Sequence, residues 1–183
     1  MKLLNYYRHV FAKSINELSC TNVLTMDIVE LNDSTPVRIR PYKTPLTDRR
    51  KMAEILQEWK QAGIVSDSTS AYSSPVLLVN KTNGENRICI DYRKLNQQTV
   101  MQSFPMPDVD AQLSKLANGP IFTTLDLSNR FLQIPLTAEA KDKIAFVTED
   151  TTAKFERMPF GLKTAQRSGW SSASTPPLRR RLR

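Results

Sequence analysis

The residues of this chain with the clearest chemical potential are one aspartate and the segments around it. Asp126 follows residues 121–125, an apolar and β-branched run that predicts a strand ending at the carboxylate. Carboxylate oxygens at the rim of a sheet are ligands that suit Mg²⁺. A strand-end aspartate is also a common structural cap, so the neighbouring motifs must decide its role.

Three motifs stand around Asp126 in a recognisable order. Residues 90–96 read Ile-Asp-Tyr-Arg-Lys-Leu-Asn, Phe131 follows the aspartate, and residues 158–163 read Met-Pro-Phe-Gly-Leu-Lys. This order resembles the reverse transcriptase of gypsy-type LTR retrotransposons, an RNA-directed DNA polymerase that is part of a Pol polyprotein. The resemblance extends over residues 4–164.

The resemblance implies a two-metal Mg²⁺ site and a nucleotide site. Asp126 matches the family's first catalytic, metal-binding aspartate, and the backbone carbonyl of Leu127 contributes to the same metals. The residues implied to bind the incoming deoxynucleoside triphosphate are Lys81, Arg87, Phe131 and Phe160. An arginine suits bidentate phosphate contact and a lysine supplies a point charge, while the aromatic residue after Asp126 crowds the 2′ position of the sugar.

An RNA or DNA template–primer is the second implied partner. The residues implied to contact it are Arg93, Pro159 and Gly161, and a glycine permits close approach of nucleic acid. Arg130 departs from the family, which commonly has glycine or another small residue there. Its side chain either obstructs the triphosphate or adds a phosphate contact, and the sequence leaves this open. Without the resemblance, a solvated hairpin and plain core packing would be the ordinary explanations for the basic and aromatic residues.

The carboxylates that would complete a two-metal site are missing from the sequence. No Asp or Glu follows Glu156, whereas the family carries its later aspartate pair on a Tyr-x-Asp-Asp hairpin. A single carboxylate cannot position two metal ions. Glu149 and Asp150 fall in an expected turn and are interpreted as solvated charges, and Asp91 lies in another part of the chain. We therefore expect that the chain does not polymerise by itself.

The resemblance implies an α+β fold: a fingers lobe and the incomplete palm of a right-hand polymerase, with a disordered C-terminal tail. The expected division is a connector at 1–35, a fingers-like region at 36–120, a partial palm at 121–165 and an Arg-rich tail at 166–183. The tail lacks any hydrophobic period.

Hydrophobic periodicity predicts the elements of these regions. A helix is expected to begin at the N-cap Thr47 and to end at Gly63, because the apolar residues between them recur at helical spacing. Further helices are expected at 3–12 and 107–117. Strands are expected at 37–40, 75–79, 87–90, 121–125, 143–148 and 153–158, with an Asn-Gly turn joining the second and third.

Composition adds a second hypothesis and excludes some classes of protein. The net charge is +8, but five arginines and no acid fall after residue 165, leaving 21 basic against 18 acidic residues before it. The alternative function is therefore a non-catalytic fragment that binds nucleic acid weakly through the tail, or the product of a decayed element.

One histidine and two cysteines argue against a zinc site, and Cys89 is expected to be buried. No signal peptide or apolar run long enough for a bilayer is found, so an intracellular location, cytoplasmic or nuclear, is expected.

Overall fold

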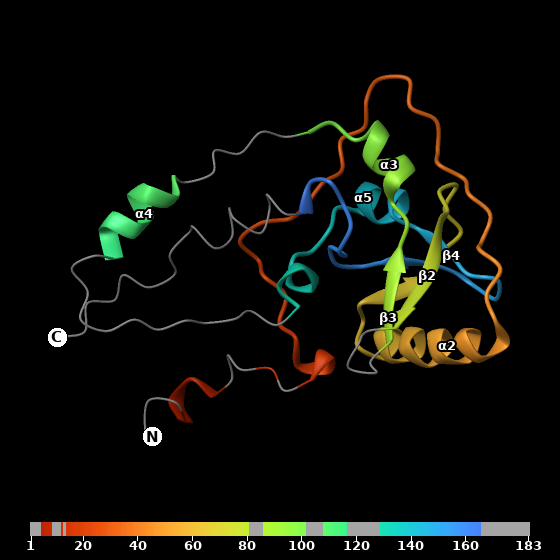
Figure 1. Ribbon diagram of the computed structural model, residues 1–183, viewed down its shortest axis with the longest axis horizontal. Coiled ribbons are helices and arrows are strands. Elements are labelled where there is room, and N and C mark those ends of the chain that lie inside the picture. Colours follow the sequence, from red (N-terminus) through yellow and green to blue (C-terminus); the bar gives the residue numbers. More distant parts are fainter. Residues whose placement is uncertain are drawn as a thin grey trace.

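A computed structural model describes residues 5–8, 12, 14–80, 86–101, 108–116 and 129–165 of the chain. Within these residues the elements follow one another as mixed helices and strands (Figure 1). They are η2 (Ile15–Glu17), α2 (Leu46–Gln61), β1 (Val65–Asp67), β2 (Ser74–Asn80), β3 (Asn86–Ile90), α3 (Arg93–Gln98), α4 (Val109–Leu116), η3 (Arg130–Gln133), α5 (Ala138–Lys143), β4 (Phe146–Val147) and β5 (Thr152–Phe155).

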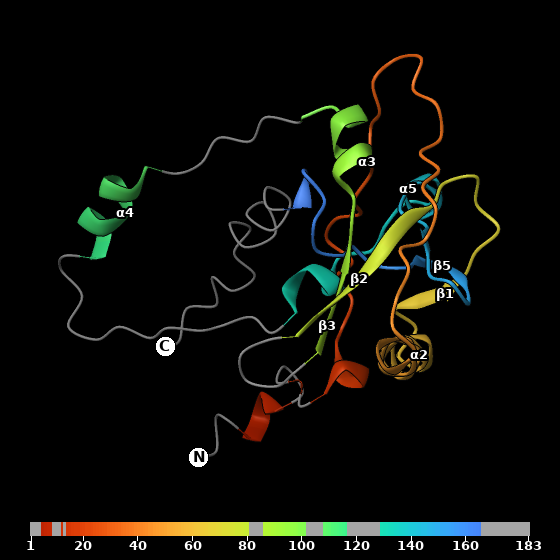
Figure 2. The ribbon, with the colours of Figure 1, turned by 45° about the vertical axis from the view of Figure 1, so that its right-hand side comes forward.

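The strands of the described residues form one five-stranded sheet in the order β1-β5-β4-β2-β3. All pairs are antiparallel except β2 with β4, where Ser74 lies opposite Phe146. Figure 1 and Figure 2 show α2 beside one end of the long β2–β3 hairpin and α3 at the other end. The hairpin therefore connects two helical regions that lie far apart.

The helix α2 begins two residues earlier than the sequence predicts. Pro45, not Thr47, is the N-cap residue, and its carbonyl oxygen accepts from the amides of Asp48 and Arg49, both at 3.0 Å. Pro has a fixed φ that suits this position, here −54°. The correction shows that backbone geometry set by proline outweighs the hydroxyl of a nearby threonine.

The predicted end of α2 at Gly63 is confirmed. Gly63 has φ +63°, its amide donates to the carbonyl of Lys60 at 3.1 Å, and the amide of Ile64 donates to that of Trp59 at 2.9 Å. These two bonds define a Schellman motif, in which the left-handed residue is usually glycine. The chain is thereby turned back into β1, which starts at Val65.

The first predicted hairpin is confirmed, and the second is shorter than predicted. In the first, β2 and β3 pair in register up to Asn80 opposite Asn86. In the second, β4 and β5 pair only through Phe146 with Ala153 and Val147 with Thr152. The residues preceding β4 form the unpredicted helix α5, which is capped by the hydroxyl of Thr137 accepting from the amide of Ala140 at 3.2 Å.

The remaining predicted elements have mixed outcomes. The strand at 37–40 is only a single parallel bridge between Arg38 and Ser73. The helix at 107–117 is present as α4, but Leu113 of its expected apolar side is 57% exposed. The strand at 121–125, most of the helix at 3–12 and the tail at 166–183 lie outside the described residues.

The core contains residues from the segment predicted to be a connector. Leu18, Met26 and Ile28 are buried with the sheet residues, and Met26 forms a parallel bridge with Leu136. Arg157 adds a polar link, because its Nη1 donates to the carbonyl of Leu18 at 3.0 Å. The N-terminal segment is therefore part of the same packed body as β5.

Aromatic side chains fill the centre of the sheet. Phe155 lies between Phe146, at 5.3 Å between ring centroids, and Trp59 of α2, at 5.5 Å. Tyr92 is also buried, and its hydroxyl donates to the carbonyl of Ile144 at 2.9 Å. No helix among the described residues has the length and apolar character needed to cross a membrane.

Candidate functional site

Two arginines and two phenylalanines form the group of side chains that we call the aromatic–guanidinium cluster: Arg87, Phe131, Phe160 and Arg130. The rings of Phe131 and Phe160 meet edge to face, with 5.0 Å between centroids and 83° between planes. The guanidinium carbon of Arg87 lies 4.9 Å from the centroid of Phe160, and that of Arg130 lies 4.9 Å from the centroid of Phe131. Each distance is within the range of a cation–π contact.

Three separate elements supply these four residues. Arg87 is an exposed residue of β3 opposite Val79, and Phe160 belongs to the turn after β5. Phe131 and Arg130 lie on η3, whose preceding residue Asn129 has φ +47°. Asparagine tolerates this left-handed conformation better than most residues. The cluster therefore depends on tertiary packing of the hairpin against two turns.

Asn96 fixes the turn that carries Phe160. Its Nδ2 donates to the carbonyl of Gly161 at 2.8 Å, and its Oδ1 accepts from the amide of Lys163 at 2.7 Å. Gly161 has φ +95°, a conformation that other residues rarely adopt, although a Cβ there would make only ordinary contacts with Tyr92 and Ile90. Asn96 thus joins the motif at residues 90–96 to the motif at residues 158–163 by two hydrogen bonds. The sequence did not predict this role.

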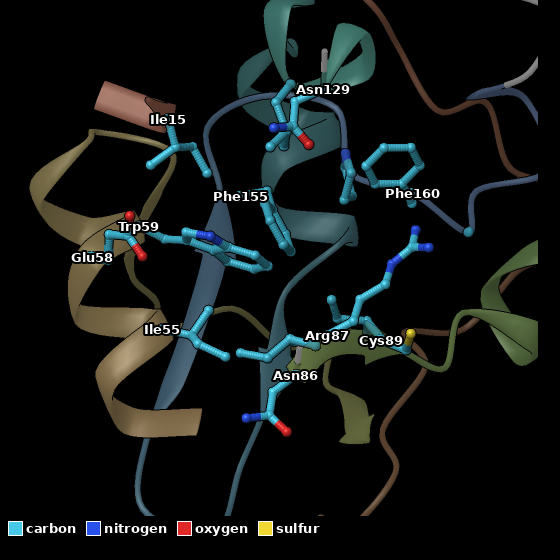
Figure 3. Close-up of a pocket in the computed structure, with 15 residues that line it drawn as sticks. Ile15, Ile55, Glu58, Trp59, Asn86, Arg87, Cys89, Asn129, Phe155 and Phe160 are labelled. Atoms are coloured by element: carbon cyan, nitrogen blue, oxygen red, sulfur yellow. The ribbon is translucent and has the colours of Figure 1, made fainter. Parts of the chain in front are cut away.

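A cavity of about 820 Å³ lies beside the cluster and reaches back to α2 (Figure 3). Arg87 and Phe160 face each other at one side of it, and Trp59, Glu58 and Ile55 of α2 lie at the other side. Its remaining lining residues are Ile15, Asn86, Ile88, Cys89, Ile90, Asn129, Leu132, Phe155, Pro159 and Gly161. A concave space with apolar walls and a few polar groups has the general character of a ligand site.

Cys89 corrects one expectation from the sequence. It was expected to be buried, but it is half-buried and lines the cavity. Its register explains the difference, because Cys89 pairs with Leu77, which is exposed on the outer face of the hairpin. Side chains of paired residues project to the same face of a sheet.

Arg93 lies on α3, separate from the cluster. Its side chain is 82% exposed, and its Nε and Nη2 donate to the two carboxylate oxygens of Asp91 at 2.8 and 2.6 Å. The hydroxyl of Tyr42 donates to the same carboxylate at 2.9 Å. The Arg93 hydrogen bond in particular holds the pKa of Asp91 well below its usual value. Asp91 therefore keeps Arg93 in a fixed orientation on the surface.

Glu149 differs from the solvated charge that the sequence suggested. It forms an ion pair with Arg49 of α2, and its side chain is mostly buried. Asp150 beside it is largely exposed, as expected for a turn residue. The distance in sequence between residues 49 and 149 explains why only the tertiary structure reveals this pair.

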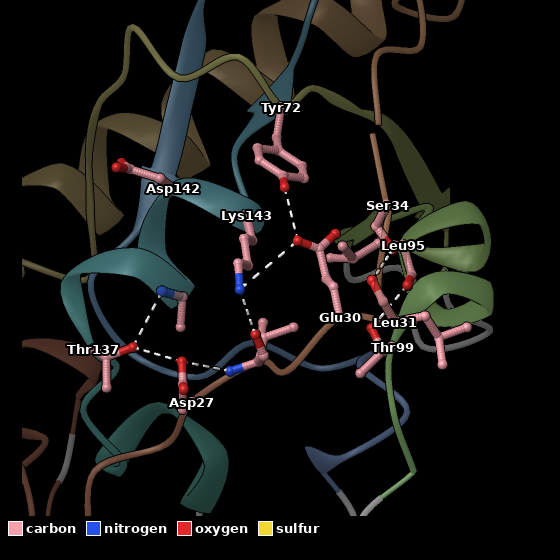
Figure 4. A network of polar contacts seen from close by, with 12 residues as sticks. Asp27, Glu30, Leu31, Ser34, Tyr72, Leu95, Thr99, Thr137, Asp142 and Lys143 are labelled. Atoms are coloured by element: carbon pink, nitrogen blue, oxygen red, sulfur yellow. Dashed lines mark hydrogen bonds and ion pairs between the residues drawn. The ribbon is translucent and has the colours of Figure 1, made fainter. Parts of the chain in front are cut away.

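A second polar group, which we call the polar network, consists of Asp27, Glu30, Tyr72, Thr137 and Lys143 (Figure 4). The hydroxyl of Tyr72 donates to Glu30 at 2.7 Å, and Nζ of Lys143 lies 3.7 Å from the same oxygen and donates to the carbonyl of Ile28 at 2.7 Å. Thr137 donates to Asp27 at 2.9 Å. Burial and the Glu30 carboxylate raise the pKa of Tyr72 to about 12.

The sequence-predicted site residues fall into three groups. The structure brings Arg87, Phe131 and Phe160 together, with Pro159 and Gly161 lining the same cavity. Arg93 is on α3, held by Asp91. Outside the described residues lie Lys81, Asp126 and Leu127.

The metal site cannot be built from the residues that the structure describes. Among them, no group of three or more His, Cys, Asp or Glu side chains could hold a metal ion. Asp126 is not one of these residues, so its part in a metal site stays a prediction.

Comparison with known protein families gives a match that includes the motifs at residues 90–96 and 158–163. Residues 79–166 match the family described as "Reverse transcriptase (RNA-dependent DNA polymerase)". The chain belongs to the reverse transcriptase family, as its sequence predicted.

Its relatives are Pol polyproteins of gypsy-type transposons. The chain is 34% identical over 168 residues to the "Retrovirus-related Pol polyprotein from transposon opus" of Drosophila melanogaster and to that from transposon 297. It is 32% identical over 156 residues to that from transposon gypsy. These matches cover 89%, 89% and 82% of this chain, but only 17%, 16% and 15% of the relatives. The chain therefore spans about a sixth of the length of the curated relatives it matches.

Solved structures confirm the expected α+β polymerase fold. The native prototype foamy virus protease–reverse transcriptase superposes with a TM-score of 0.81 at 20% identity, over 94% of this chain and 23% of that chain. A foamy viral protease–reverse transcriptase in complex with an RNA/DNA hybrid superposes with a TM-score of 0.76, at 20% identity and the same coverage. At this level of identity the likeness establishes the fold alone.

Proposed function

We propose that this chain is the nucleotide- and template-binding part of an RNA-directed DNA polymerase, and that it does not polymerise by itself. The observation that carries the proposal is the aromatic–guanidinium cluster. Arg87, Phe131 and Phe160 were assigned to nucleotide binding from sequence alone, and they come from three elements that meet in one place. Residues this far apart in the sequence would not be expected to lie together by chance.

The cluster has the chemistry for a nucleoside triphosphate. Arg87 is exposed on β3, and the described carboxylates leave its guanidinium N–H groups available to phosphate oxygens. Phe131 is half-buried against Phe160 and can restrict the space at the sugar. Phe160, 39% exposed, offers apolar surface at the mouth of the cavity.

A template–primer is the proposed second partner. Arg93 presents a fixed cation on the surface of α3, and Gly161 exposes backbone in the turn beside the cavity. The foamy viral relative with the same fold is described in complex with an RNA/DNA hybrid. We extend this partner, and an intracellular location, to the present chain as part of the proposal.

Metal chemistry belongs to the complete polymerase in this proposal. Mg²⁺ would activate the primer hydroxyl and stabilise the leaving pyrophosphate, with the Asp126 carboxylate and the Leu127 carbonyl among its ligands. The chain as it stands has no carboxylate after Glu156 to complete such a site. Its own residues bind and orient the nucleotide and the template.

Two measurements on the purified 183-residue chain test the proposal. Calorimetry should detect binding of dATP with Mg²⁺ in the presence of an RNA/DNA template–primer, and the Phe160→Ala variant should bind more weakly. Incorporation of dATP into the primer should be absent. Absence of dATP binding would refute the nucleotide site, whereas incorporation that is abolished by Asp126→Asn would refute the proposed inactivity.

A further inference from the structure

Arg130 is the member of the aromatic–guanidinium cluster to which no function has been assigned. It stands where the family commonly has a small residue, and the sequence leaves open whether it obstructs a bound triphosphate or contacts it. The structure places its guanidinium group 4.9 Å from the centroid of the Phe131 ring. This position is equivalent to that of Arg87 on Phe160.

The cluster therefore has an approximate internal symmetry. Two rings meet edge to face at 5.0 Å, and each ring carries one guanidinium group. A perpendicular pair of rings is a favourable and well-defined arrangement.

The two cations differ in their partners from the basic residues that form ion pairs. Arg49, Arg93, Lys60, Lys141 and Lys154 each pair with a carboxylate. Among the described residues, no carboxylate lies within ion-pair distance of Arg87 or Arg130, and neither makes a described hydrogen bond. An arginine has five N–H donors in one plane, so stacking on a ring leaves these donors available at its edge.

We propose that Arg130 and Arg87 form a two-guanidinium clamp for the polyphosphate of a nucleoside triphosphate, each over one ring of the Phe131–Phe160 pair. The inference rests on the proposed nucleotide site and adds a second cation to it. Stacking holds Arg130 against Phe131, which lowers the entropy cost of ordering its side chain. A ligand with several phosphates can contact both guanidinium groups, whereas a monophosphate contacts one at most.

A structural role for Arg130 makes a different prediction. If Arg130 only supports the Phe131 ring, its loss alters the sugar-binding surface, which dATP and dAMP share. The affinities for both nucleotides then fall together. A phosphate contact instead lowers the affinity for dATP selectively, so the ratio of the two dissociation constants separates the roles.

The test compares dATP, dADP and dAMP binding to the full chain by calorimetry in the presence of Mg²⁺ and template–primer. The variants are Arg130→Gln, which keeps length but removes charge, and Arg130→Lys, which keeps charge but removes the planar group. Arg50→Gln on the exposed side of α2 is the matched control for loss of one positive charge. Thermal unfolding of each variant monitors its fold.

Arg130→Gln should weaken dATP binding about tenfold, as expected for one charge-assisted hydrogen bond, and should change dAMP binding less than about twofold. Arg130→Lys should lie between Arg130→Gln and wild type, and Arg50→Gln should match wild type. Equal losses for dATP and dAMP, or no loss, would overturn the clamp and leave the nucleotide site standing. If Arg130→Gln unfolds, the ratio of the dissociation constants for dATP and dAMP is measured on Arg130→Lys instead. A selective loss of dATP affinity supports the clamp, and equal losses or no loss overturn it. Failure of the wild type to bind any of the three nucleotides would overturn both proposals.

Discussion

The polar network and the aromatic–guanidinium cluster use cations in opposite ways. Lys143 of the network is mostly buried, and it contacts the Glu30 carboxylate and a backbone carbonyl. Arg87 of the cluster is exposed, and its guanidinium carbon lies 4.9 Å from the centroid of the Phe160 ring, with no ion pair to a described carboxylate. The first cation has internal partners for its charge, and the second has donors left over.

This difference indicates which charged groups hold the fold and which are available to a ligand. A buried cation must have its partners within the protein, because burial of an unpaired charge is costly. An exposed arginine on an aromatic ring gains only a modest stabilisation. Substitutions in the network should therefore change stability, and substitutions in the cluster should change binding.

The largest expected effect is on stability at Lys143. Lys143→Met leaves Glu30 without its cation and removes the bond to Ile28, so the free energy of unfolding should fall by about 3 kcal/mol. Lys154→Met is the matched control, because Lys154 pairs with the exposed Asp142 and should cost less than about 1 kcal/mol. Urea denaturation measures both. Equal losses would show that the network has no special role.

A smaller effect, on binding, is expected at Arg87. Arg87→Gln should weaken dATP binding about tenfold because a charged donor to phosphate is lost. Its free energy of unfolding should change by less than about 1 kcal/mol, since only a cation–π contact is removed. Calorimetry and urea denaturation on the same preparation check the two parts. A large loss of stability would place Arg87 with the network rather than with a ligand site.

The network should also be visible in an alkaline titration of Tyr72. Its pKa is raised from 10.0 to about 12 in the folded chain, so the stability that its neutral form contributes is present below pH 10 and is lost as the pH rises through about 12. Phenolate absorbance of wild type minus Tyr72→Phe isolates this group. Glu30→Gln should lower the pKa of Tyr72 because the carboxylate raises it. Titration of Tyr72 at pH 10 in the wild type would contradict the burial and the hydrogen bond.

The smallest effect is expected at the surface pair of Asp91 and Arg93. The pKa of Asp91 is depressed, mainly by the Arg93 hydrogen bond, so its contribution to stability is present above pH 3.8 and is lost as the pH falls below that value. Arg93→Gln should shift the Asp91 pKa upward and lower the free energy of unfolding slightly above pH 3.8, and this difference from wild type should disappear as the pH falls below that value. Carboxyl NMR titration measures the shift. An unchanged pKa would show that the pair does not persist in solution.

The elements that were predicted correctly are those specified by local sequence. The helix that ends at Gly63 was predicted from helical spacing and a glycine, and the pairing of β2 with β3 was predicted from two short apolar runs. The Asn-Gly sequence predicted to join these strands lies outside the described residues. The helix α5 was missed although Thr137 is a standard capping residue, because no element was predicted for residues 138–142 and the expected strand began at residue 143. The start of α2 was misplaced by two residues because proline geometry was given too little weight.

The residues proposed to bind the nucleotide were singled out by motif, but their arrangement was not predicted. Nothing in the sequence indicates that Asn96 bonds to the turn at Gly161, or that Arg87 stacks on Phe160. The same holds for Glu149, whose partner Arg49 is distant in the chain. Such contacts depend on how separate elements pack, and side-chain periodicity carries no information about them.

The sequence by itself determined the family, the order of the motifs and the local elements, because these depend on residue type and short-range spacing. It also determined that no carboxylate follows Glu156. Only the tertiary structure decided which cations are paired and which are free, since that depends on distances between residues on different elements. The N-terminal segment belongs to the core for the same reason: Leu18, Met26 and Ile28 are buried by residues far along the chain.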